Sequence, residues 1–194
     1  MNLAEFSQKL TDNLTADLNY EEEKKEIVAY GIETFFLTAL GFLIILGISY
    51  VLNSVFPAII ATIFGGSLRK LSGGAHFSTP TKCLLFGAVV YSLIGVSAKE
   101  IVAHGFTSPG VLLAVLVVSL VIVFIYAPVD SEAKPIHSQT FRKKLKVASL
   151  AFVLLTLVIV LLNNNLLINT SAVMGIGYQS LTLLPVFNKR RKEA

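Results

Sequence analysis

Long apolar runs alternate with short polar connections along the whole chain. A helix needs about 20 apolar residues to cross the roughly 30 Å hydrocarbon core of a bilayer, and most of these runs approach that length. Tight turns between paired runs are indicated by Asn53-Ser54, Ser108-Pro109 and Asn163-Asn164-Asn165. The pattern therefore predicts an all-α integral membrane protein with about six membrane segments, at residues 31–52, 54–68, 83–103, 109–127, 147–162 and 166–187.

The second segment is short for a membrane span. Residues 31–64 are nearly uncharged, and their helical length exceeds one crossing but falls short of two. Pro57 stands near the start of the second segment, where a helix tolerates proline. A helical hairpin whose second arm is short or re-entrant fits this pattern best.

The N-terminal residues have a different periodicity. Apolar side chains recur there at spacings of three and four among mostly polar neighbours, at Leu3, Phe6, Leu10, Leu14 and Leu18. This spacing predicts an amphipathic helix with a narrow apolar stripe, which lies on the membrane surface or caps the bundle. Residues 1–26 are too polar for a cleavable signal peptide, so we expect the first hydrophobic segment to act as an uncleaved insertion signal.

Charge sets the expected orientation. Only 14% of the 194 residues are charged, whereas soluble domains average about 25%. If all six segments reverse the chain, every one of the 16 Lys and Arg residues except Lys99 falls on one side. Cytoplasmic loops carry such an excess, so we expect both termini in the cytoplasm. The chain is then one polytopic membrane domain over residues 1–194, with an amphipathic segment (1–26), membrane helices (27–187) and a basic tail (188–194).

The connection at residues 65–82 is the strongest candidate for a functional site. It contains His76, one of three histidines, and leads directly into Cys83, the only cysteine. Thr79 and Pro80 have the pattern of a helix N-cap followed by proline at the first helical position, which places Cys83 in the first turn of a helix. A helix N-terminus favours negative charge, so a thiol there tends toward the thiolate.

A cysteine and a histidine are the minimal set for nucleophilic attack on a carbonyl carbon. The imidazole of His76 would take the proton of the Cys83 thiol and later protonate the leaving amine. The backbone amides of Gly73 and Gly74, together with the free amides at the helix start, are candidate donors to the oxyanion. On the residues alone, a cysteine peptidase is one of two interpretations of this loop.

Each of these features also has a plain structural interpretation. A lone cysteine at a membrane helix end is commonly an inert small hydrophobe, a lone histidine an interfacial hydrogen-bonding group, and Gly-Gly a simple turn. Arg69 and Lys70 would then be topology signals that contact lipid headgroups. His137 shares the expected side of Cys83 and is an alternative base, whereas Gln179 is expected to bond to a neighbouring helix.

Composition narrows the remaining classes of function. The chain has no phosphate-cradling glycine loop and no paired metal-ligand spacing, so we expect no cofactor, no metal and no nucleic-acid partner. The main alternative to an enzyme is a non-enzymatic membrane peptide exporter or scaffold, although spans almost free of charge argue against ion-coupled transport. A zinc hydrolase is disfavoured because only His76, His137 and Cys83 share a side, and none of them is paired.

At these residues the sequence resembles the accessory gene regulator B (AgrB) family of bacterial quorum-sensing membrane peptidases. The resemblance rests first on Arg69 through Cys83, which has the form Arg-x3-Gly-Gly-x-His-x6-Cys. It is supported by the stretch Tyr126-Ala127-Pro128-Val129-Asp130, by Lys134-Pro135-Ile136 and by the basic run that follows. Length and hydrophobic layout are similar over nearly the whole chain.

The resemblance implies a concrete activity at the cytoplasmic face of a bacterial cell membrane. Such an enzyme cleaves a short signal-peptide precursor near its C-terminus, with Cys83 forming a thioester and His76 acting as general base and acid. A Cys or Ser inside the precursor then displaces the enzyme thiol, giving a cyclic thiolactone or lactone peptide. Gly73, Gly74 and Arg69 would support the oxyanion or position the substrate.

The same resemblance suggests where partners bind. Arg69 and the basic run that includes Arg142, Lys143 and Lys144 would hold acidic residues in the C-terminal tail of the precursor, because the charge signs match. Membrane lipids are the other expected partner. The amphipathic N-terminal helix is expected to pair either with the leader of the precursor or with a second subunit, which would make the protein a dimer.

Overall fold

The computed structural model describes residues 3–16, 20–75, 77, 79–130 and 138–188. Those residues form seven α-helices and no strand, which confirms the expected all-α class. The helices are α1 (Leu3–Leu14), α2 (Glu22–Val51), α3 (Val55–Ser72), α4 (Pro80–Ala103), α5 (Pro109–Tyr126), α6 (Gln139–Leu162) and α7 (Leu166–Leu181). Helix α1 corresponds to the amphipathic segment, and each of α2 to α7 corresponds to one predicted hydrophobic segment.

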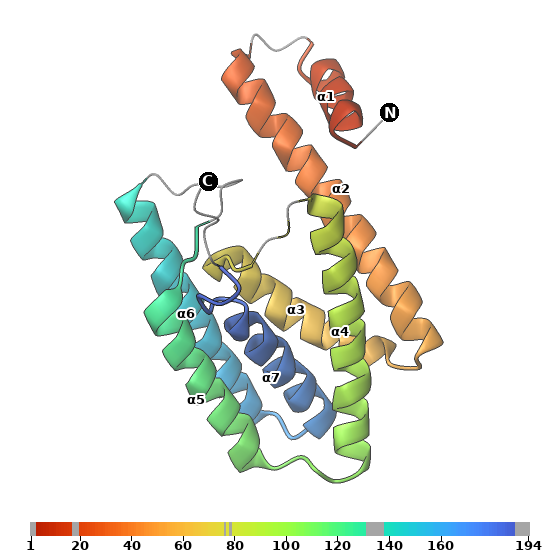
Figure 1. The fold of residues 1–194 in the computed structure, drawn as a ribbon, viewed down its shortest axis with the longest axis vertical. Coiled ribbons are helices and arrows are strands. Elements are labelled where there is room, and N and C mark those ends of the chain that lie inside the picture. The colour runs from red at the N-terminus through yellow and green to blue at the C-terminus, as the bar shows by residue number, and fades with distance from the viewer. Residues whose placement is uncertain (1–2, 17–19, 76, 78, 131–137, 189–194) are drawn as a thin grey trace.

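Helix α7 lies at the centre of the bundle (Figure 1). It contacts α3, α4, α5 and α6, and its most extensive contact is with α3. Helices α2 and α4 pack together on one side, and α5 and α6 on the other. The chain reverses at each connection from α2 onward, so that α3 ends, α4 begins, α6 begins and α7 ends toward the same end of the bundle.

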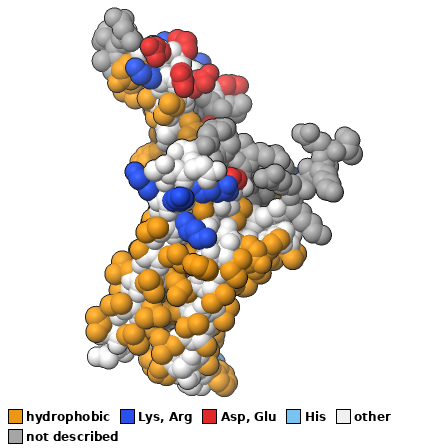
Figure 2. Space-filling model, turned by 90° about the vertical axis from the view of Figure 1, so that its left-hand side faces the viewer, with side chains coloured by type: hydrophobic (Ala, Val, Ile, Leu, Met, Phe, Trp, Pro, Cys, Tyr) orange, Lys and Arg blue, Asp and Glu red, His pale blue; other side chains and the backbone are white. Residues whose placement is uncertain are grey.

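We call this end the basic end, because Lys and Arg side chains form a band across it (Figure 2). The described basic residues at these helix ends are Arg69, Lys70, Lys82, Arg142, Lys143, Lys144 and Lys146. Lys99 lies near the other end of α4, where its Nζ donates to the carbonyl oxygen of Asn53 at 3.0 Å. The described helices therefore separate the basic residues as the sequence predicts.

Four helices, α2, α4, α5 and α6, are long and apolar enough to cross a membrane. Helices α3 and α7, with 18 and 16 residues, are not among them. Large apolar side chains of the four long helices point outward, among them Leu93, Val117, Phe124 and Leu162. Such an apolar surface suits surrounding hydrocarbon rather than water. The number of crossings and the sides on which the termini lie stay predictions.

Helix α3 extends beyond the predicted end of the second segment. The sequence pattern predicts an end at residue 68 and irregular chain from Gly65, but Gly65 and Gly66 are helical and α3 continues to Ser72. A Cβ on Gly65 would lie 2.7 Å from the carbonyl oxygen of Gly175 and 2.6 Å from the Tyr91 hydroxyl oxygen. This close tertiary contact outweighs the low helix propensity of glycine.

The basic run after residue 141 is also helical, where the sequence pattern predicts a loop up to residue 146. Helix α6 begins at Gln139, so Arg142, Lys143 and Lys144 lie on its first two turns. The N-cap Ser138 explains this early start, since its hydroxyl accepts a hydrogen bond from the amide of Phe141 at 3.3 Å.

Helix α1 packs on α2 through small hydroxyl side chains. Ser7, Thr11 and Thr15 are buried, although they lie outside the predicted apolar stripe. Within that stripe Phe6 and Leu14 are exposed, Leu14 to 61%. The amphipathic prediction is therefore right about the helix, while its most deeply buried face is the hydroxyl face.

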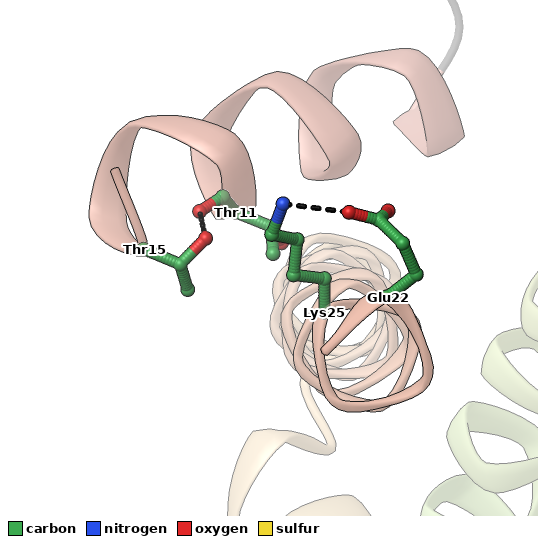
Figure 3. Close-up of polar contacts among 4 residues, drawn as sticks. All are labelled: Thr11, Thr15, Glu22 and Lys25. Atoms are coloured by element: carbon green, nitrogen blue, oxygen red, sulfur yellow. Dashed lines mark hydrogen bonds and ion pairs between the residues drawn. The ribbon is translucent and has the colours of Figure 1, made fainter. Parts of the chain in front are cut away.

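Figure 3 shows two local hydrogen bonds where α1 and α2 pack together, one at the end of α1 and one within α2. The hydroxyl of Thr15 donates to the carbonyl oxygen of Thr11 at 2.8 Å, which closes the last turn after α1. Lys25 Nζ donates to Glu22 Oε1 at 2.8 Å in the first turns of α2. Acidic residues in the first turn of α2, Glu22 and Glu23, also complement the helix dipole.

The α3–α7 contact generates a test of the fold. A Cβ on Gly175 would overlap the carbonyl oxygen of Ala61, whereas a Cβ on Gly66 meets nothing within 4 Å. We expect Gly175→Ala to destabilise the bundle by about 1–3 kcal/mol through overpacking, and Gly66→Ala to be neutral or slightly stabilising. Thermal midpoints of the purified protein in detergent would check this. Equal midpoints for Gly175→Ala and wild type would refute the close crossing.

Candidate active site

Cys83 lies in the first turn of α4, at the basic end of the bundle. Thr79 is the N-cap of this helix: its hydroxyl accepts a hydrogen bond from the amide of Lys82 at 3.4 Å, and Pro80 occupies the first position. The amide of Cys83 donates to the carbonyl oxygen of Thr79 at 3.2 Å. These contacts confirm the predicted cap and leave the thiol half-buried beside a helix N-terminus.

Arg69 is the charged group that reaches the sulfur. It projects from the last turn of α3, and its Nη2 lies 3.4 Å from Cys83 Sγ. The same Nη2 donates a hydrogen bond to the carbonyl oxygen of Ala75 at 2.5 Å. A positive group beside a partly exposed sulfur is typical of reactive cysteines, because it stabilises negative charge that develops there. Arg69 therefore joins the loop after α3 to the sulfur on α4.

The loop after α3 requires glycine at both of its first positions. Gly73 has φ +68° and Gly74 has φ +141°, in the region that favours glycine. A Cβ on Gly73 would overlap the carbonyl oxygen of Val129, whose amide donates to the carbonyl oxygen of Ser72 at 2.9 Å. Gly73 is therefore pressed against the chain that follows α5.

The two glycine amides differ as potential oxyanion donors. The amide of Gly73 donates to the carbonyl oxygen of Arg69 at 3.0 Å and so completes the C-terminal cap of α3. The amide of Gly74 has no acceptor among the described residues. Of the predicted pair, Gly74 is the one with an amide left to bind a developing negative charge.

The C-terminal end of α7 forms hydrogen bonds with this loop. Gln179 is fully buried, and its Nε2 donates to the carbonyl oxygen of Gly73 at 2.7 Å. The amide of Ala75 donates to the carbonyl oxygen of Thr182 at 3.2 Å. Sequence reasoning assigns Gln179 a bond to a neighbouring helix but not a place in the site. No local signal links it to Gly73, which is 106 residues away in the chain.

Arg142, predicted to hold substrate, has a partner within the chain. Its Nη2 donates to Asp130 Oδ2 at 2.8 Å, with both side chains partly exposed. The ion pair attaches the segment after α5 to the start of α6. Val129, which packs against Gly73, belongs to that segment. Lys143 and Lys144 are exposed next to it and line a shallow groove with Thr140, Val147 and Ala148.

Two predicted bases cannot be placed. His76 and His137 lie outside the described residues, so the expected Cys83–His76 pairing stays a prediction. His104 caps the far end of α4, remote from Cys83, as the sequence indicates. Among the described residues, no three His, Cys, Asp or Glu side chains are grouped to hold a metal ion.

The Asp130–Arg142 pair leads to a second test. Asp130→Asn and Arg142→Gln should each lower the thermal midpoint by a few degrees, because each leaves one charge without its partner. The exchange of Asp130→Arg with Arg142→Asp should restore the midpoint, since an acidic residue near the N-terminus of α6 also suits the helix dipole. If the exchanged protein melts no higher than the single variants, the pair does not fasten the loop.

Comparison with known proteins agrees with the motif resemblance. Residues 7–183 match the profile of the Accessory gene regulator B family. An AgrB-like protein of Clostridium perfringens (strain 13 / Type A) is 29% identical over 94% of this chain and 92% of its own length. AgrB-like proteins of Clostridium acetobutylicum and Listeria innocua are 25% and 23% identical, over 94% and 96% of this chain and 87% and 91% of theirs. No solved structure matches. The chain belongs to the Accessory gene regulator B family, which is related to quorum-sensing signal processing.

Proposed function

We propose that this protein is a membrane-embedded cysteine endopeptidase that removes the C-terminal part of a small quorum-sensing signal-peptide precursor. The observation that carries the proposal is the Arg69 guanidinium, whose Nη2 contacts both Cys83 Sγ and the carbonyl oxygen of Ala75. The only cysteine of the chain thereby lies in an electropositive setting beside a glycine loop. Family membership supports the same substrate class.

In the first step, Cys83 Sγ attacks the carbonyl carbon of the scissile amide. His76 takes the thiol proton, and the tetrahedral oxyanion receives hydrogen bonds from the Gly74 amide or from Arg69. As the C–N bond breaks, His76 gives its proton to the leaving amine. The products are the freed C-terminal tail and a thioester between Cys83 and the N-terminal part of the precursor.

In the second step, a Cys thiol or Ser hydroxyl inside the precursor attacks the thioester carbonyl. The C–S bond to the enzyme breaks, and the nucleophile's proton passes by way of His76 to Cys83. A thiolactone or lactone ring forms and the enzyme thiol is regenerated, so no oxidant, metal or cofactor takes part. The thioester retains the acyl group in an activated form, which makes ring closure feasible without another energy source.

The basic end would face the cytoplasm of a bacterial cell. The end of α3 and the starts of α4 and α6 carry the Lys and Arg side chains of this basic end. Cytoplasmic loops of membrane proteins carry such an excess of positive charge. Precursor synthesised on ribosomes would meet the site from that side. Both termini are then cytoplasmic, and the chain is one multi-pass domain.

The proposal predicts which side chains cleavage needs. Purified protein in lipid would be mixed with a candidate short signal-peptide precursor, and the product masses recorded. Wild type should release the tail and yield a cyclic peptide, whereas Cys83→Ala and His76→Ala should lose activity by 1,000-fold or so while staying folded. Cys83→Ser should be nearly as slow, since a serine hydroxyl is far less readily ionised than a thiol.

Continued cleavage by Cys83→Ala would contradict the proposal. It would favour the alternative function, a non-enzymatic membrane peptide exporter or scaffold. Loss of wild-type activity on treatment with a chelator would instead point to a metal hydrolase. The analysis of product mass also separates plain hydrolysis, which adds water to the thioester, from ring closure, which does not.

The exposed lysines of α6 are proposed to hold an acidic tail of the precursor. Three basic residues near the N-terminus of α6 oppose its helix dipole, and only Arg142 has an acidic partner among the described residues. Lys143→Glu with Lys144→Glu should raise KM for the precursor by about tenfold, and added salt should reduce the difference. Lys143→Arg with Lys144→Arg retains the charge and should leave KM near that of wild type. An unchanged KM for the charge-reversed protein would rule out tail binding at this helix.

A further inference from the structure

The last turn of α7 holds the glycine loop in place by two hydrogen bonds of different kinds. The Gln179 side chain donates to the carbonyl oxygen of Gly73 at 2.7 Å, and the carbonyl oxygen of Thr182 accepts from the amide of Ala75 at 3.2 Å. The Thr182 hydroxyl in turn donates to the carbonyl oxygen of Gln179 at 2.7 Å. The loop is therefore fixed at residues 73 and 75, on either side of the available amide of Gly74.

The orientation of the Gln179 amide follows from its partners. A backbone carbonyl can only accept, so the atom 2.7 Å from Gly73 must be Nε2, which also lies 3.4 Å from Ser72 Oγ. Gln179 Oε1 is buried and accepts no hydrogen bond from the described residues. An apolar side chain of the same shape would bury no unpaired acceptor of its own, but it would leave the carbonyl oxygen of Gly73 with Ser72 Oγ, 3.2 Å away, as its remaining donor. The bond to the loop therefore explains the Gln179 amide better than packing does.

A short series of contacts connects α7 to the sulfur. Ala75 is held by Thr182 through its amide and by Arg69 through its carbonyl oxygen. The Arg69 atom that binds this oxygen is the one that lies 3.4 Å from Cys83 Sγ. A shift of the loop would therefore move the guanidinium relative to the sulfur.

We propose that Gln179 is a positioning residue of the active site: by holding Gly73, it sets where Ala75 and hence the Arg69 guanidinium lie beside Cys83. Gln179 touches neither substrate nor sulfur in this role, and acts through the loop. Its effect on cleavage rests on the proposed function, but its effect on the reactivity of the Cys83 thiol does not. The two ideas can therefore fail separately.

The test measures how fast iodoacetamide alkylates the full-length protein in lipid nanodiscs at neutral pH. Cys83 is the only cysteine, so a single mass shift reports on it. Gln179→Met is close in shape but has no donor, and we expect it to slow alkylation by about threefold to tenfold, the range for one lost hydrogen bond. With the precursor, the same variant should lower kcat and leave KM nearly unchanged.

Ser180→Ala is the matched control. Ser180 is as deeply buried as Gln179, but its hydroxyl donates only to the carbonyl oxygen of Ile176 within α7. We expect Ser180→Ala to be alkylated at the wild-type rate. Thermal midpoints would show that the compared proteins are folded. If Gln179→Met does not fold, Gln179→Asn replaces it, because the shorter amide stays polar but cannot reach Gly73.

A double-variant comparison separates positioning from a general structural role. In an Arg69→Met background the guanidinium is absent, so Gln179→Met should cause no further loss of alkylation rate. Two results would overturn the proposal: wild-type alkylation of a folded Gln179→Met protein, or an equal loss with and without Arg69. Both are readable even if no precursor is cleaved.

Discussion

The close crossing of α3 and α7 fixes the geometry on which the candidate site depends. The backbones meet at Gly65 and Gly175, where any side chain would overlap atoms of the other helix. Helix ends cannot shift independently once two rigid helices are locked at such a contact. The crossing therefore sets the distance between the C-terminal turns of α3 and α7, which carry Arg69 and Gln179. Dispersion between closely packed backbones is the force available here, because lipid tails offer no hydrophobic drive for helix association.

A second constraint comes from the medium. Non-helical backbone near a membrane is tolerated only where its polar groups find partners in the protein. The backbone of residues 72–75 has partners on three separate elements. The Val129 amide after α5 donates to the carbonyl oxygen of Ser72, and the Gln179 side chain on α7 donates to that of Gly73. The Ala75 amide donates to the carbonyl oxygen of Thr182 at the end of α7, and the Ala75 carbonyl oxygen accepts from Arg69 on α3. The left-handed glycines let the chain turn sharply enough to reach all of them. The contacts that pair these backbone groups are thus the same contacts that give the candidate site its shape.

The elements governed by local rules were the ones that the sequence could predict. The hydrophobic runs locate α2 to α7, and the Thr79–Pro80 cap places Cys83 in the first turn of α4, since capping depends on residues only a few positions apart. The sequence motif also singles out Arg69, Gly73, Gly74 and Cys83, and the fold brings Arg69 within 3.4 Å of Cys83 Sγ. The helical state of Gly65 was not, because it depends on contact with Gly175, far along the chain.

Long-range pairing explains the other differences. Arg142 was expected to be free for substrate, but Asp130 lies in the connection before α6 and no helical periodicity relates the two. The sequence predicts that Gln179 bonds to a neighbouring helix, whereas its contact with Gly73 depends on the fold. On α1 the apolar stripe is plain, yet Ser7, Thr11 and Thr15 face inward because small side chains let two helices approach.

The choice of arginine at position 69 follows from these contacts. The guanidinium must satisfy the carbonyl oxygen of Ala75 and also face Cys83 Sγ, two atoms that approach it from different elements. A planar fork with five donors, held by one hydrogen bond, keeps its remaining charge aimed in a fixed direction. An ammonium on a flexible stem is more strongly hydrated and would divide its time between the loop and water. In a half-buried position, a fixed positive group therefore stabilises negative charge on the sulfur better than a mobile one, and the loop that fixes Arg69 is part of the candidate site.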